Sequence, residues 1–236
     1  MTNIEKQTRQ DLAAVYRLIA HYGWDDLIYT HISARIPDTD TFLINQWGLC
    51  FDEITASNLV KVDYAGNVIG VGKINPTGYV IHGVIHQARP EVSCIIHTHT
   101  PAGAAVAADP EGLWPISQKA MICLSRLSYH DYQGIVLDDA EKQQLVQELG
   151  TNRFMILRNH GLLTVGNTIE ETFHSHRLLE LACEIQIRCN RDHVIFLGTD
   201  KIDRVKKQID QFFTKFEVPW AALMRIVTKY YPDYAD

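Results

Sequence analysis

Two histidines two positions apart end an apolar stretch, in "IIHTHTPAG" at residues 95–103. Residues two apart on a β-strand point to the same side, so a buried strand here would aim the imidazoles of His97 and His99 at one place. A third histidine, His160 in "RNHGLL", follows the apolar stretch "FMILR" in a turn that Gly161 permits. Neutral imidazole binds zinc and other divalent metals, and three of them leave a fourth position open for water or substrate. The pattern predicts a catalytic type of metal site, with a pair of hydrogen-bonded core histidines as the alternative.

Further histidines occur at spacings that favour other roles. His82 and His86 lie four apart on one face of an expected helix, but the glutamate that follows the first histidine in zinc proteases is absent, which favours packing. His174 and His176 lie two apart on an expected helix, face different directions and are expected on a solvated surface. The surroundings of His130, in "SYHDY", indicate no particular role.

The composition of the chain excludes several classes of protein. Its 236 residues are 46% hydrophobic, and no Pro/Gly/Ser-rich linker or repeat divides them, so one domain over residues 1–236 is expected. A net charge of −6 without a basic stripe argues against nucleic acid as a partner. No apolar run approaches the roughly 20 residues of a membrane span, and the polar start "MTNIEKQTRQ" is unlike a signal peptide. Five cysteines without a Cys-x-x-Cys pair favour buried thiols in a reducing, cytoplasmic setting.

The elements that must position the three histidines follow from hydrophobic periodicity and turn residues. Apolar residues at helical spacing predict a first helix that Gly23 ends, and Thr168 is expected to cap a long amphipathic helix. The order of elements predicts an α/β fold of mostly hairpin-like strands with helices packed around them. Helices are expected over residues 4–22, 78–90, 101–109, 139–150, 168–191 and about 200–217, and strands or extended pieces over 27–37, 41–48, 66–70, 92–100, 112–117, 126–137 and 153–166.

The segments around these histidines resemble the class II aldolase/adducin family. "HTHTPAG", followed about 60 residues later by "RNHGLL", is the centre of the resemblance, which extends over nearly the whole chain through "GWDDLIYTHISARIP", "NPTGYVIHGVIH", "AVAADPEGLWPIS", "LSYHDYQGI" and "ACEIQIR". The chain looks closest to the adducin-head-like branch and its bacterial relatives. The resemblance implies a single-domain α/β/α sandwich with a central, largely antiparallel sheet, and a homotetramer with its site between subunits. It also implies that His97, His99 and His160 bind a divalent metal, with zinc favoured and iron or manganese as alternatives.

The resemblance also implies lyase chemistry on a small molecule. In sugar-phosphate aldolases of the family the metal polarises substrate oxygens and stabilises an enediolate, while a glutamate moves the proton. That glutamate lies four residues before a helix histidine that matches His82, and Gly78 stands there in this chain. We therefore expect a metal-dependent aldolase or lyase that acts on a small hydroxylated carbonyl or carboxylate compound, with no catalytic acid–base residue assigned.

Positions that match the family's phosphate site are changed as well. A Gly-Asn pair before a strand serine becomes Thr30-His31 before Ser33, and two later pairs become Trp47-Gly48 and Pro76-Thr77. Backbone N–H groups and small hydroxyls cradle phosphate well, whereas a bulky histidine and a proline without N–H do so less readily. A protonated His31 could still hold an anion. Substrate contacts are predicted for His31, Ser33, Gly48, Thr77 and Lys119, the last at a position where some aldolases place a catalytic tyrosine.

Two other functions stay open at this stage. Three histidines also suit ferrous iron, and some family members are non-haem iron oxygenases that act on aromatic substrates. The adducin head is an interaction domain, and the missing glutamate is in keeping with a non-catalytic binding domain. Against that reading stand the retention of all three predicted ligands and a final segment, "KYYPDYAD", without the long basic extension of adducins.

Overall fold

A seven-stranded sheet forms the centre of the molecule. The computed structural model describes residues 1–76, 78–134, 139–198, 200–212 and 215–236. Within them, neighbouring strands run antiparallel except for the parallel pair at one edge, β5 and β6, so the prediction of a largely antiparallel sheet is confirmed. The strand order is β3 (Val60–Asp63), β2 (Thr41–Ile44), β1 (His31–Arg35), β4 (Cys94–Thr98), β7 (Gly161–Gly166), β6 (Phe154–Leu157) and β5 (Leu127–His130).

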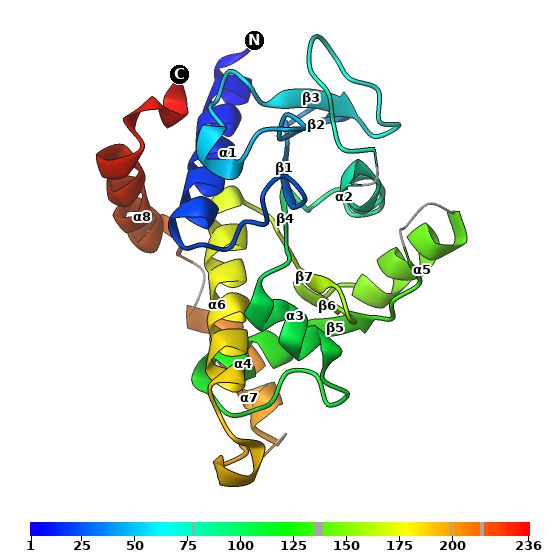
Figure 1. Ribbon diagram of the computed structural model, residues 1–236, viewed down its shortest axis with the longest axis vertical. Helices are drawn as coiled ribbons and strands as arrows, with labels where there is room; N and C mark the ends of the chain where they lie inside the picture. The colour runs from blue at the N-terminus through cyan, green and yellow to red at the C-terminus, as the bar shows by residue number, and fades with distance from the viewer. Residues whose placement is uncertain (77, 135–138, 199, 213–214) are drawn as a thin grey trace.

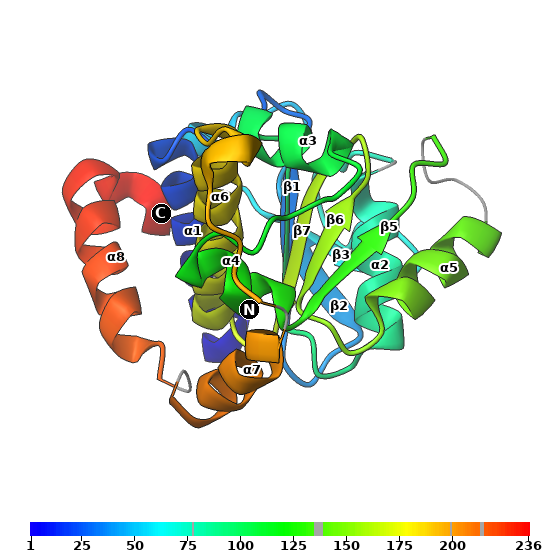
Figure 2. The same cartoon turned by 90° about the horizontal axis from the view of Figure 1, so that it is seen from below.

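Helices cover both faces of the sheet and complete three layers (Figure 1). On one face, α1 (Asn3–His21) packs against β1, and α6 (Ile169–Ile187) packs against β4 and β7. On the other face lie α2 (Gly78–Ala88) and α5 (Asp139–Leu149), and Figure 2 shows the sheet between the two pairs of helices. The predicted α/β/α sandwich is therefore confirmed.

The remaining helices surround this sandwich. α3 (Pro101–Ala108) follows β4 directly, and α4 (Gln118–Leu124) packs between α6 and α7 (Asp200–Phe212). α8 (Glu217–Tyr230) lies outside α1, at the left of Figure 1. Short 3₁₀ helices cover Phe51–Glu53, Arg191–His193 and Pro232–Ala235. None of the helices in the described ranges is both long and apolar enough to cross a membrane.

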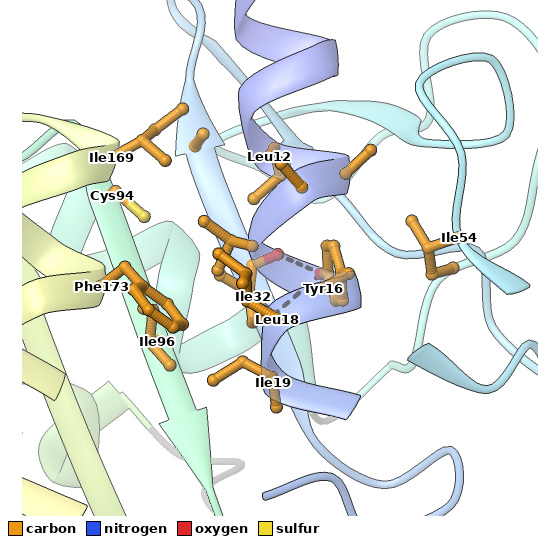
Figure 3. Packing of buried hydrophobic residues seen from close by; sticks show 14 of the residues in the cluster. Leu12, Tyr16, Leu18, Ile19, Ile32, Ile54, Cys94, Ile96, Ile169 and Phe173 are labelled. Carbon is orange, nitrogen blue, oxygen red and sulfur yellow. Dashed lines mark hydrogen bonds between the residues drawn. The ribbon is translucent and has the colours of Figure 1, made fainter. Parts of the chain in front are cut away.

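The main core lies between α1, β1 and α6 (Figure 3). Apolar residues at helical spacing on α1, such as Ile19, are fully buried there. Tyr16 carries its hydroxyl into this layer, where it accepts hydrogen bonds from the backbone N–H of Ile32 at 2.9 Å and of Asn45 at 3.0 Å. The hydroxyl also donates to the carbonyl of Ile32. These bonds join α1 to two strands and fix the strand that begins with His31.

Two helix starts, which follow β4 and β7, agree with the sequence prediction. The side chain of Thr168 caps α6 by accepting a hydrogen bond from the N–H of Glu171 at 3.1 Å. Pro101 opens α3, and Thr100 caps it by accepting from the N–H of Gly103 at 3.0 Å. Each hydroxyl satisfies one N–H group that the first turn leaves free. The caps define where the chain turns after β4 and after β7.

Candidate metal centre

His97, His99 and His160 come together at one end of the sheet. His97 lies on β4, His99 follows that strand, and His160 occupies the turn between β6 and β7. Because β4 and β7 pair antiparallel, with Thr98 opposite Leu162, the end of β4 lies beside the start of β7. The Nε2 atom of His99 is 2.8 Å from that of His97 and 2.9 Å from that of His160. The three side chains converge as the strand spacing predicts.

The turn that carries His160 depends on a close approach of two backbones. Asn159 adopts a left-handed conformation with φ of 56°, which asparagine tolerates better than most residues. Gly161 does not have a positive φ, but a Cβ on it would collide with the carbonyl oxygen of Thr98. The glycine is therefore required by the contact with β4 rather than by the turn itself, which corrects the reason that the sequence suggested.

Hydrogen bonds fix which nitrogen carries the proton in two of the rings. The Nδ1 of His97 is 2.9 Å from the carbonyl oxygen of Leu162, and the Nδ1 of His99 is 3.2 Å from a carboxylate oxygen of Asp26. Both oxygens only accept, so both Nδ1 atoms donate and both Nε2 atoms carry lone pairs. Two lone pairs 2.8 Å apart repel unless a proton or a cation lies between the rings. Nitrogens bound at about 2.0–2.1 Å to a tetrahedral zinc lie about 3.3 Å apart, so a small spreading of the rings would admit the ion.

Two of the three rings, those of His97 and His160, are held in the neutral form that binds metals. Burial lowers the pKa of His97 well below its usual value, and the imidazoles of His99 and His160 lower it further. Burial is also the main reason why the pKa of His160 falls to about 4, with His99 and His130 adding to it. Because protons and metal compete for the same nitrogen, a lowered pKa favours metal binding at neutral pH. The donor set thus fits a divalent metal.

A buried carboxylate holds the segment around His99. Glu180 of α6 accepts hydrogen bonds from the hydroxyls of Thr98 at 2.6 Å and Thr100 at 2.7 Å, one on each side of His99. His176, one turn earlier on α6, lies 3.2 Å from Glu180, and both side chains are fully buried. The prediction of a solvated position for His176 is wrong, because α6 packs against the sheet as well as against α3 and α4.

A cavity of about 240 Å³ opens beside the three histidines. His31, one of the predicted substrate contacts, lies in its wall, and the ring centroid of His31 is 5.0 Å from that of His97. Within the described chain, no lysine or arginine lines this cavity. Its volume suits a compound of a few carbon atoms rather than a large ligand. Besides the three histidines, its wall includes Tyr29, His31, Asn75, Gly78, Ile81 and Tyr132.

The other predicted substrate contacts do not line this cavity in the described chain. Ser33 is fully buried, and its hydroxyl bonds two histidines of α2. Gly48 lies in an exposed turn with φ of 98°, and Lys119 lies on α4. Thr77 lies outside the described residues. Of the five predicted contacts, the structure brings His31 to the cavity.

His31 fills the space that a side chain at residue 78 would need. A Cβ on Gly78, the first residue of α2, would lie 2.5 Å from Cδ2 and 2.7 Å from Nε2 of His31. A glutamate at residue 78 is therefore incompatible with the observed position of the His31 ring. The histidine at residue 31 and the glycine at residue 78 are two parts of one arrangement.

A second imidazole borders the site from the β5 side. His130 is 4% exposed, and its Nδ1 lies 2.6 Å from a carboxylate oxygen of Glu148 on α5, so Nδ1 donates and Nε2 carries a lone pair. This Nε2 is buried and has no hydrogen-bond partner among the described residues. Sequence reasoning missed the pair because its members lie 18 residues apart on different elements. His130 borders a cavity of about 10 Å³ that shares four lining residues with the larger cavity, namely Ile81, Tyr132, Gly134 and His160.

Known proteins resemble this chain in sequence and in fold. The pattern of the family described as Class II Aldolase and Adducin N-terminal domain matches residues 10–187. An aldolase II superfamily protein from Pseudomonas syringae superposes with a TM-score of 0.95 over 100% of this chain and 98% of its own, at 44% identity. L-fuculose 1-phosphate aldolase from Glaciozyma antarctica superposes with a TM-score of 0.84 over 99% of this chain and 95% of its own, at 27% identity. Alpha-adducin of Rattus norvegicus is 46% identical over 190 residues, which are 78% of this chain and 26% of that protein.

Proposed function

The chain belongs to the class II aldolase and adducin family, and on that premise we propose that it is a metal-dependent lyase of the aldolase type. Its substrate would be a small hydroxylated carbonyl or carboxylate compound that fits a cavity of about 240 Å³. The observation that carries the proposal is the convergence of His97, His99 and His160, with two Nε2 lone pairs directed at each other. Such an arrangement is unfavourable on its own and favourable around a cation.

The three histidines would hold the metal through Nε2, with zinc favoured and iron or manganese as alternatives. A bound divalent metal would act as a Lewis acid on the carbonyl and hydroxyl oxygens of the substrate and stabilise negative charge there. Asp26 and the carbonyl of Leu162 orient two of the rings, and Glu180 fixes the backbone on both sides of His99. Three protein ligands leave room for substrate oxygens in the coordination sphere.

We assign the proton transfer to Nε2 of His130, since residue 78 offers no carboxylate. When this atom takes the proton of a substrate hydroxyl, the imidazolium that forms is stabilised by the carboxylate of Glu148 on its other nitrogen. The cavity of about 10 Å³ beside it is just large enough to admit one water molecule, which would carry the proton between substrate and ring. The same atom can return the proton to carbon when the bond is cleaved.

The test is aldol cleavage by protein of known metal content. Metal-free protein would be loaded with zinc, manganese or ferrous iron and offered small ketoses and hydroxy acids, and the released carbonyl fragment would be measured. We expect cleavage that needs one metal per chain and stops with a chelator. The substrate named for the Glaciozyma antarctica relative, L-fuculose 1-phosphate, is expected to be cleaved poorly because residue 78 is glycine. A protein that binds no metal under these conditions would contradict the proposal. Oxygen uptake by the iron-loaded protein would instead indicate that it is an oxygenase rather than a lyase.

We also propose a homotetramer in which the metal lies near a subunit boundary. This proposal rests on the family, and on α8, where Val218 is 79% exposed and Trp220 and Leu223 are only partly covered. Lys119, which does not line the cavity of its own chain, would then be a candidate to reach a neighbour's site. Light scattering at micromolar concentration should return four chains per particle, and a monomer would contradict this arrangement.

A second candidate is a non-catalytic binding domain. The missing carboxylate at residue 78 and the likeness to alpha-adducin favour it. A binding domain of this kind is expected to hold a metal or a small ligand without cleaving any of the small ketoses and hydroxy acids offered to it. Full metal occupancy together with no cleavage would therefore favour this candidate over the lyase.

A further inference from the structure

A chain of buried hydrogen bonds runs between β1 and α2, from Val92 near the start of β4 to the cavity. The carbonyl oxygen of Val92 lies 3.3 Å from Nδ1 of His86, whose Nε2 lies 2.8 Å from the hydroxyl of Ser33. That hydroxyl lies 2.5 Å from Nδ1 of His82, whose Nε2 lies 2.7 Å from Nδ1 of His31. All four side chains are buried, and only the ring of His31 reaches the cavity wall.

The chemistry of the groups gives this chain one direction. A carbonyl only accepts, so Nδ1 of His86 donates to Val92, and Nε2 of the same neutral ring must accept from Ser33. Ser33 has one hydroxyl hydrogen, so its oxygen accepts from Nδ1 of His82. The remaining nitrogen of His82 then accepts from Nδ1 of His31. Nε2 of His31 is consequently a lone pair at the cavity wall, next to Gly78.

The geometry around His31 favours a neutral ring and so this lone pair. The ring is 5% exposed, and its Nδ1 donates to His82, behind which lie Ser33 and His86 rather than a carboxylate. Gly78, beside Nε2, is the first residue of an 11-residue helix, and the positive end of a helix disfavours another positive charge.

We propose that His31 is a specificity residue, whose Nε2 accepts a hydrogen bond from an uncharged hydroxyl group of the substrate and rejects a phosphate at that place. The proposal rests on the proposed function and narrows the substrate to compounds that are unphosphorylated at the end facing His31. A phosphate group at neutral pH offers mostly lone pairs, which a second lone pair repels. Since no lysine or arginine of the described residues lines the cavity, no other side-chain cation there compensates.

This inference replaces the expectation that a protonated His31 holds an anion. It also gives Ser33 a role without substrate contact, since its hydroxyl sets the direction of the hydrogen bonds that end at His31. A position that holds phosphate in related aldolases would, in this chain, hold a hydroxyl group. This change of substrate group would need no change in the three histidines proposed as metal ligands.

The test uses two chelating compounds that differ at one end. Glycolohydroxamate and its phosphate ester both bind a metal through the hydroxamate, and one ends in a hydroxyl, the other in a phosphate. Calorimetric titration of the zinc-loaded protein should show at least tenfold tighter binding of the hydroxyl compound. The substitution His31→Asn, which offers an amide N–H in place of the lone pair, should reduce this ratio at least tenfold or reverse it. The same substitution at an exposed histidine, His193→Asn, should leave the ratio unchanged.

Two outcomes would overturn the inference. One is wild-type protein that binds the phosphate ester as tightly as the hydroxyl compound. The other is a His31→Asn protein that folds, holds one zinc per chain and keeps the wild-type ratio. A zinc-loaded protein that binds neither compound would instead count against the proposed function. In that case the inference about His31 is tested by measuring the tautomer of its ring, as follows.

The tautomer can be measured without any ligand or activity. Nitrogen NMR of the imidazoles in histidine-labelled protein should show His31 protonated at Nδ1 and unprotonated at Nε2. In Ser33→Ala the series of hydrogen bonds that ends at His31 is interrupted, and this single tautomer should give way to a mixture of the two neutral tautomers. A wild-type His31 that carries its proton on Nε2, or on both nitrogens, would refute the inference whatever the protein catalyses.

Discussion

Two imidazoles flank the three converging histidines, and they are supported in opposite ways. Behind His130 lies a carboxylate, Glu148, at 2.6 Å, whereas the chain behind His31 consists of neutral groups and ends at a backbone carbonyl. The carboxylate behind His130 holds Nδ1 as the donor, in keeping with the proton transfer that we propose for Nε2. The neutral hydrogen-bonding groups behind His31 fix its tautomer and provide no negative charge that would stabilise a protonated ring. The group behind each imidazole, more than the imidazole itself, therefore distinguishes the proposed proton transfer from the proposed recognition.

The largest expected effect is the loss of the centre that both imidazoles serve. His160→Ala removes one of the three proposed ligands and leaves two, too few for a stable zinc site, so bound zinc should fall from about one per chain to nearly none. Elemental analysis after dialysis against a weak chelator measures this directly. His193→Ala is the matched control, because His193 is exposed on a short 3₁₀ helix. A His160→Ala protein that retains full zinc would show that the three histidines are not the ligands.

The next largest effect separates the two imidazoles. His130→Gln keeps a polar side chain of similar reach but cannot take a proton, so turnover should fall about 10²–10⁴-fold with zinc content unchanged. His31→Gln should change the Michaelis constant more than the turnover number, since it alters recognition. Steady-state kinetics of both variants on the substrate found in the panel decide the matter. Equal losses of turnover in the two variants would show that the two imidazoles do not have different roles.

An intermediate effect concerns how pH changes the stability that His86, one of the neutral groups behind His31, contributes. Burial, with Arg35 adding to it, lowers the pKa of His86 to about 3 from 6.5, so the unfolded chain takes up a proton that the folded chain refuses. This contribution to stability is fully present above pH 6.5 and is lost as the pH falls from 6.5 towards 3, by about 3 kcal/mol at pH 4. In metal-free protein, the unfolding temperature of His86→Gln should therefore fall less steeply with acid than that of the wild type. Parallel curves by circular dichroism would count against a neutral, buried His86.

The smallest expected effect lies behind His99. Glu180→Gln keeps the shape of the side chain but weakens the hydrogen bonds from Thr98 and Thr100, so the zinc dissociation constant should rise about tenfold. Glu184→Gln, one turn further along α6 on a partly exposed side, should leave it unchanged. Competition with a fluorescent chelator gives both constants. No change in Glu180→Gln would mean that the hydrogen bonds to Glu180 stabilise the fold without affecting zinc binding.

The sequence predicted most of what local spacing controls. The two-residue spacing of His97 and His99, together with the turn at His160, predicted that the three side chains converge, and they do. His31 and Ser33 are likewise two residues apart on β1 and point to one face of the sheet, and His82 and His86 are four apart on one face of α2. Their hydrogen bonds could not be foreseen, because they depend on how α2 docks on β1.

Errors at the level of elements have equally physical reasons. The strand expected to start at residue 27 starts at His31, because Leu27 has a φ of 50° and Tyr29 closes a turn onto Asp26. α4 has only seven residues, too few for a periodic signal. α8 contains Pro219 in its first turn, where proline is compatible with a helix although it suggests a break.

The contact between His31 and Gly78 has a consequence for evolution. Because the His31 ring occupies the volume of a Cβ at residue 78, a side chain can be added at residue 78 only when the ring has moved away or the histidine has been replaced. A lineage that acquires a side chain at residue 78 must first, or at once, move the ring away or replace the histidine with something smaller, and the reverse order applies to a lineage that acquires the histidine. Homologous sequences should therefore fall into two groups at these positions, one with a bulky residue 31 and glycine at 78, the other with a small residue 31 and an acid at 78. That pairing would let a single pair of alignment columns sort the family by the kind of substrate its members accept.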